Sequence, residues 1–223
     1  MARQRRFSVP GLPHLVAQRG HNGQAVISDA RDAQLWLDIL RDVSLSHRVA
    51  LHGWRLSETE FALLLTPSSA DGLSRLCQDW GRRYVGAFNA RHGRSGTLWD
   101  GRFRCALVGP GAWELRALAW LERDEPVPPG HASRAHHLGL SESPALTDPK
   151  SYWSLGNTPF ERHSAWRHRL DGAGDDFAWE QALRSGRPIG DAPWRSQLQA
   201  LTTVPLEPRP RGRPTKALAA LQS

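Results

Sequence analysis

Residues 49–67, VALHGWRLSETEFALLLTP, contain two apolar stretches on either side of a short polar segment. Val49 to Arg55 alternates between apolar and other residues, whereas Phe61 to Leu65 is a continuous apolar run that ends just before Pro67. The first pattern is typical of a half-buried strand and the second of a fully buried one. The stretch therefore predicts two neighbouring antiparallel strands.

The segments on both sides of this pair follow strand and helix patterns. Before the pair, residues 13–19 read as a strand, and apolar residues recur at helical spacing from Asp29 to about Ser46. After it, helical spacing returns over residues 71–92 and 112–123, with a turn or short hairpin at 97–103. This order predicts an α+β fold in which a small antiparallel sheet carries helices on one face.

The 223 residues divide into three parts by composition. A proline-rich stretch, Pro126-Val127-Pro128-Pro129-Gly130, ends a first domain of residues 1–130. Residues 131–204 read as short helical pieces separated by Gly and Pro, which we expect to form a helical extension. Residues 205–223 are too rich in Pro and Arg to bury a core, so we expect a disordered basic tail.

Arginine dominates the charge of the chain. Lys and Arg number 29 against 22 Asp and Glu, which gives a net charge of +7, and Lys150 and Lys216 are the only lysines. Arginine favours bidentate contacts with phosphates and base edges. Cys77 and Cys105 show no CxxC spacing, and no apolar run approaches the roughly 18 residues of a membrane helix. These features argue against a disulfide framework and a membrane protein, and we expect a cytoplasmic, nucleoid-associated protein.

Four stretches share a longer pattern: PHLVAQRGHN at 13–22, DGLSR at 71–75, GRRYVGAFNARHGRSGTLWDGRFR at 81–104 and YWSLGNTPFER at 152–162. Over about residues 5–170 the chain resembles the REP-associated tyrosine transposases, relatives of the insertion-sequence transposases of HUH type that cut single-stranded DNA. The resemblance implies a ferredoxin-like core that binds single-stranded or hairpin DNA. It also implies a His-x-His pair that holds a divalent cation, and a helical tyrosine that attacks the phosphate.

The residues that carry this chemistry in the family are replaced in this sequence. The His-x-His position reads Glu60-Phe61-Ala62, and the tyrosine position falls on Trp120, or on Leu121 if one gap is allowed. The family's Asn ligand falls on Asp124. Glu60 and Asp124 are residual candidates for binding Mg²⁺, or they are two solvated acids; apart from Mg²⁺ at such a pair, we expect no cofactor. We interpret Tyr84 as a core or groove-lining residue and the pair His136-His137 as solvated.

Two basic regions are candidates for DNA binding. The first falls within the best-matching region and comprises Arg75, Arg82, Arg83, Arg91, Arg94, Arg102 and Arg104. The second is the tail segment PRPRGRPTK at 208–216, which looks like an AT-hook whose Arg211 and Arg213 would enter an A·T-rich minor groove.

Three functions follow from these observations. The first is a DNA-binding protein of the transposase family that has lost strand cleavage. The second is an active transposase that cleaves and rejoins single strands through an unorthodox site. The third is a regulator that binds RNA hairpins. The expected partner in the first two cases is single-stranded or hairpin DNA, with A·T-rich duplex contact by the tail, bound by a monomer or a homodimer.

Overall fold

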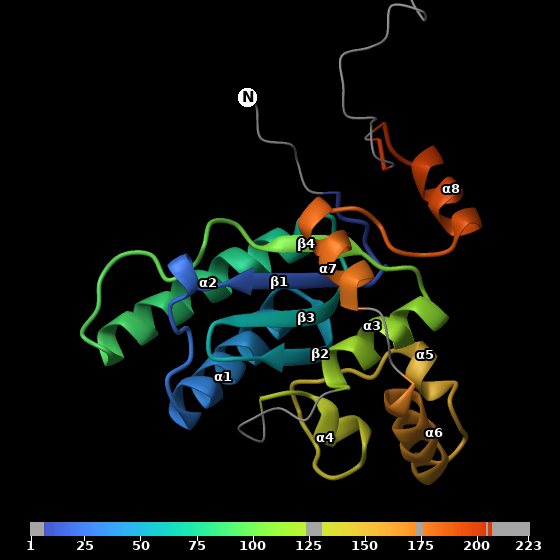
Figure 1. The fold of residues 1–223 in the computed structure, drawn as a ribbon, viewed down its shortest axis with the longest axis horizontal. Coiled ribbons are helices and arrows are strands. Elements are labelled where there is room, and N and C mark those ends of the chain that lie inside the picture. The colour runs from blue at the N-terminus through green and yellow to red at the C-terminus, as the bar shows by residue number, and fades with distance from the viewer. Residues whose placement is uncertain (1–6, 124–130, 173–175, 204, 207–223) are drawn as a thin grey trace, which may run out of the picture.

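The computed structural model describes residues 7–123, 131–172, 176–203 and 205–206. Four strands form one antiparallel sheet in the order β2-β3-β1-β4 (Figure 1). The strands are β1 (His14–Arg19), β2 (Val49–Leu56), β3 (Glu60–Pro67) and β4 (Arg104–Leu107). The α+β fold with an antiparallel sheet is therefore confirmed.

The edge strand β4 was not expected from the sequence. Its four residues, Arg104 to Leu107, follow the predicted turn at 97–103 and pair with β1 from Ala17 back to His14. A strand of four residues is too short for a clear alternating pattern. Hydrogen bonding to β1 defines this strand, so the tertiary arrangement determines it.

Helices α1 (Ala30–Ser46) and α2 (Gly72–Arg91) pack on one face of the sheet. Asp29 caps α1, because its carboxylate accepts hydrogen bonds from the backbone N–H groups of Arg31 and Asp32. Between these helices and the sheet lies an aromatic cluster in which Phe61 contacts Trp36, Trp80 and Trp99 at ring-centroid distances of 4.8–5.6 Å. Burial of these rings fixes both helices on this face.

The opposite face of the sheet is also covered by helices, one of which, α7, comes from the helical extension after residue 130. α3 (Ala112–Glu122) packs against β2 and β3, and α7 (Asp176–Ser185) crosses β4 and β1 in front of the sheet in Figure 1. Gly53 permits the close approach of α3, since a Cβ at this position would lie 2.4 Å from the Leu118 side chain. Successive residues of β3 point to opposite faces of the sheet, and both sets are apolar, so each face is covered by a layer of helices.

The remaining elements are the short helix η1 (His21–Gly23), α4 (Arg134–His137), α5 (Lys150–Trp153), α6 (Pro159–Asp171) and α8 (Ala192–Ala200). Residues of α5 and α6 pack into the core of the second face, whereas α8 packs in a separate small cluster with Leu107. α6 begins with a complete capping box formed by Thr158 and Glu161, and its buried Trp166 packs into the core of the second face. The expectation of short helical pieces after residue 130 agrees with these elements. A bilayer-spanning length of apolar residues occurs in no helix of the described chain.

Candidate nucleic-acid interface

Charged side chains gather on the face of the sheet that α3 and α7 cover. Alternate residues of a strand point to the same face, and the strand register aligns Arg19 with Glu60 and both Arg55 and Ala17 with Ala62. Arg104 lies opposite Ala17 on β4. Together with the helices these residues line a cavity of about 260 Å³, which we call the sheet cavity. Its principal lining residues are Ala17, Arg19, Arg55, Glu60, Ala62, Arg104, Trp120, Glu180 and Arg184.

Two helices form the walls of the sheet cavity. Trp120 of α3 is 4% exposed, and the guanidinium of Arg55 stacks over its ring at 4.5 Å from the centroid. Trp179 of α7 packs beside Trp120 at a ring-centroid distance of 6.4 Å. α7 also contributes Arg184, 3.9 Å from Glu180 one turn earlier on the helix. The cavity is thus built from a strand floor, an indole wall and a charged helix.

The residues of the sheet cavity do not fit the divalent cation that the resemblance implies. Ala62 offers no ligand atom, and the two carboxylates that line the cavity are Glu60 on β3 and Glu180 on α7, which lies 3.9 Å from Arg184. Arg19, Arg55 and Arg104 line the same cavity, and their positive charges repel a cation. A hard cation such as Mg²⁺ prefers several oxygen ligands. Asp124, the other residual candidate, lies outside the described residues.

No tyrosine of the described chain lies in the sheet cavity. Trp120 lines it, and Leu121, the position reached with one gap, is fully buried in the core. Tyr84 is fully buried, and its hydroxyl donates to the Val26 carbonyl oxygen at 2.6 Å. Burial raises the pKa of Tyr84 far above its ordinary value. Tyr84 is therefore a core residue, in agreement with our interpretation of the sequence.

The predicted basic cluster is divided between two faces of the molecule. Arg75, Arg82 and Arg83 line a shallow groove along α2, which packs on the face of the sheet opposite the cavity. Arg75 pairs with Asp71 at 2.6 Å, and Asp79 pairs with Arg82 at 3.0 Å and Arg83 at 3.1 Å. Arg82 is 80% exposed despite this ion pair. The groove is thus available to phosphates.

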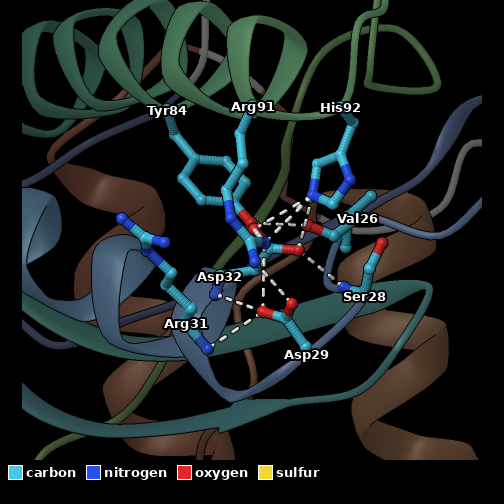
Figure 2. Close-up of polar contacts among 8 residues, drawn as sticks. All are labelled: Val26, Ser28, Asp29, Arg31, Asp32, Tyr84, Arg91 and His92. Atoms are coloured by element: carbon cyan, nitrogen blue, oxygen red, sulfur yellow. Dashed lines mark hydrogen bonds and ion pairs between the residues drawn. The ribbon is translucent and has the colours of Figure 1, made fainter.

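Arg91 is committed to contacts within the protein. Figure 2 shows Arg91 and His92, at the end of α2, converging on Asp29 and Asp32 at the start of α1. Asp32 is fully buried and also accepts the Ser28 backbone N–H at 2.9 Å. Arg91 therefore joins the two helices of one layer, a role that its sequence position does not reveal.

The other predicted DNA-binding arginines occupy separate positions. Arg94 donates to the side-chain oxygen of Gln24 at 2.6 Å and lies over the Phe88 ring. Arg102 is exposed in the loop before β4, and Arg104 lines the sheet cavity. Arg211 and Arg213 lie outside the described residues.

The pair His136-His137 is not solvated, which corrects our interpretation of the sequence. His137 is fully buried, and its Nδ1–H donates to Glu122 at 2.7 Å, while Nε2 lies 3.4 Å from Asp148. His136 Nε2 lies 3.2 Å from the same Asp148 oxygen, and its Nδ1 accepts the Ser143 backbone N–H. The side chains of His136, His137 and Asp148 bring possible metal-binding atoms within 4.8 Å of one another. Their hydrogen bonds and the raised pKa of His137 instead fit an ion-paired cluster of these three residues. The carboxylate partners were missed because they lie 11 and 15 residues away along the chain.

Sequence reasoning missed Arg19, Arg55 and Arg184. Strand alternation carries a signal for the first two. Arg19 lies two residues after Ala17 on β1, and Arg55 pairs with Ala62 in the register of β2 and β3, so both point to the face of Ala62. Arg184 has no comparable signal, since only the docking of α7 on the sheet brings it to the cavity.

Comparison with solved structures identifies a match to this architecture. A REP-associated tyrosine transposase bound to a REP hairpin superposes with a TM-score of 0.52, covering 68% of this chain and 93% of that one at 10% identity. The chain has a transposase-like fold. A candidate transposase from Deinococcus radiodurans gives a TM-score of 0.37 at 23% identity, over 49% of this chain and 88% of that one. The tRNA(His) guanylyltransferase of Saccharomyces cerevisiae gives 0.38 at 16% identity, over 77% and 76%. Neither a family model nor a curated protein matches the sequence.

Proposed function

We propose that this protein binds single-stranded or hairpin DNA and does not cleave it. The observation that carries this proposal is the content of the sheet cavity. At the positions where the resemblance implies a cation site and a nucleophile, the cavity holds Glu60, Ala62 and Trp120 beside three strand arginines. Neither an indole ring nor a methyl group can attack phosphorus or hold a metal ion, whereas guanidinium groups bind phosphate oxygens directly.

Further support for DNA binding comes from the fold and the α2 groove. One solved structure of similar fold is a REP-associated tyrosine transposase bound to a REP hairpin. In this chain Arg75, Arg82 and Arg83 form a second basic surface, and each is at least 45% exposed. Such a surface binds phosphates without any catalytic residue, and its affinity falls steeply with salt. The AT-hook-like tail, with Arg211 and Arg213, is a third contact in this proposal, directed at A·T-rich duplex.

The test is a labelled DNA hairpin with a single-stranded flank, incubated with the full chain with and without Mg²⁺ or Mn²⁺. We expect a mobility shift on a native gel and no covalent adduct on a denaturing gel. A metal-dependent covalent adduct would show that the protein is an active transposase. An RNA hairpin of the same sequence is run in parallel, and preferential binding of the RNA would replace DNA with RNA as the partner.

A further inference from the structure

We propose that the sheet cavity binds one phosphate group of single-stranded DNA through arginines, in place of a divalent cation. This inference rests on the proposed function and names the chemistry at its site. Arg19, Arg55 and Arg104 come from three different strands, and the sheet fixes their backbones on one face. Guanidinium groups on one face of a rigid sheet place several strong donors around one cavity, which suits the oxygens of a phosphate.

None of these arginines has an ion-pair partner among the residues that the structure describes. Arg19 forms no ion pair although it lies directly opposite Glu60 in the strand register, and the contact of Arg55 is with the Trp120 ring. The arginines of the α2 groove, by contrast, are each paired with Asp71 or Asp79. An arginine that is not neutralised within the protein gains more from a phosphate ligand.

The indole wall holds the third arginine. Trp120 is 4% exposed and lines the cavity, and the guanidinium of Arg55 lies 4.5 Å from the centroid of its ring. This cation–π contact restricts the Arg55 side chain and leaves its N–H groups as donors at the cavity. A phosphate oxygen is the kind of acceptor that such donors bind.

Glu60 distinguishes an anion site from a cation site. Its carboxylate is exposed at the edge of the cavity and repels a phosphate, but would attract a metal ion. Replacing this group with the neutral Gln therefore changes the two kinds of site in opposite directions. About 260 Å³ accommodates one phosphate with its adjoining sugar, but not a duplex.

The experiment measures binding of a labelled oligothymidine to the full chain by fluorescence anisotropy in the presence of EDTA. We expect binding without metal. Arg19→Gln and Arg104→Gln should each weaken it by about 10–100-fold, the range for one charge-assisted hydrogen bond. Glu60→Gln should strengthen it by about 3–10-fold, through removal of one nearby negative charge. The matched control is Arg41→Gln, which removes a half-exposed arginine of α1 that lines neither the sheet cavity nor the α2 groove.

Competition separates the sources of the phosphate. We compare three competitors: inorganic phosphate, a 5′-phosphorylated oligothymidine and its unphosphorylated form. Preference for the phosphorylated form assigns the site to a terminal phosphate, and equal binding of the two oligothymidines assigns it to an internal one. A requirement for Mg²⁺, a loss of affinity with Glu60→Gln, or unchanged binding with Arg19→Gln and Arg104→Gln would overturn the proposal. Absence of oligothymidine binding would also overturn it, and the hairpin assay then decides the proposed function separately. Thermal unfolding of each variant confirms that it is folded.

Discussion

Substitution of His137 by Gln should remove a buried cation that joins α4 to α3. His137 is fully buried between Glu122, at 2.7 Å from Nδ1, and Asp148, at 3.4 Å from Nε2. Burial of the ring opposes protonation, but the two carboxylates outweigh it and raise the pKa of His137 to about 9. Gln at this position retains an amide donor and cannot be protonated.

The expected loss follows from the difference between the folded and unfolded pKa values. A rise from 6.5 to about 9 corresponds to about 3 kcal/mol at roughly 1.4 kcal/mol per unit. Loss of one partner from a buried ion pair costs a similar amount, about 3–5 kcal/mol. Because the folded pKa is higher than the unfolded one, this stabilisation is complete below about pH 6.5 and is lost as the pH rises through about 9.

The assay is urea unfolding of the wild-type chain and His137→Gln at about pH 6 and about pH 10. We expect the free energies of unfolding to differ by about 3 kcal/mol at the lower pH and to converge at the higher one. His168→Gln, an exposed histidine on α6, serves as the control and should change stability little. A difference that stays the same between the two pH values would refute the role of the imidazolium charge.

Three further predictions concern DNA. The double substitution Arg82→Gln with Arg83→Gln should lower the slope of log affinity against log salt for a hairpin by about 2. Arg91→Gln, in contrast, should lower the urea midpoint of unfolding and change the affinity for the hairpin less than about twofold. The reverse pattern would return Arg91 to the DNA interface. Trp120→Tyr alone should yield no covalent adduct on a denaturing gel, since the residues around it offer no cation site. We expect weak nicking only when Glu60→His and Ala62→His accompany it, because metal ligands and nucleophile act as a unit. An adduct with any single change would show that the alignment is wrong. Truncation after Leu206 should weaken binding to A·T-rich duplex more than to G·C-rich duplex while hairpin binding is retained; equal losses in gel-shift titrations would mean that the tail provides only charge.

The sequence predicted the elements whose signal is local. The apolar spacing of α1 and α2 gives both helices within one or two residues. The strand β3 also begins at Glu60 and ends at Pro67 within the expected segment. Side-chain periodicity and capping depend on neighbours a few residues away, so the sequence contains them in readable form.

The sequence also determined which groups are absent from the sheet cavity. Ala62 and Trp120 carry neither a ligand nor a nucleophile in any conformation, and no tyrosine lies between Tyr84 and Tyr152. The chemistry of a side chain is fixed by its identity alone. Its surroundings are not.

Tertiary structure alone decided the surroundings of each charged group. Packing of α1 against α2 turns Arg91 from an exposed cation into a partner of the buried Asp32, and folding of α4 onto α3 buries His137 beside Glu122. The docking of α7 brings Arg184 to the cavity, and pairing with β1 creates β4. These contacts join residues that are distant in sequence, and their energy depends on burial and on charges brought together only in the folded chain, which local patterns do not encode.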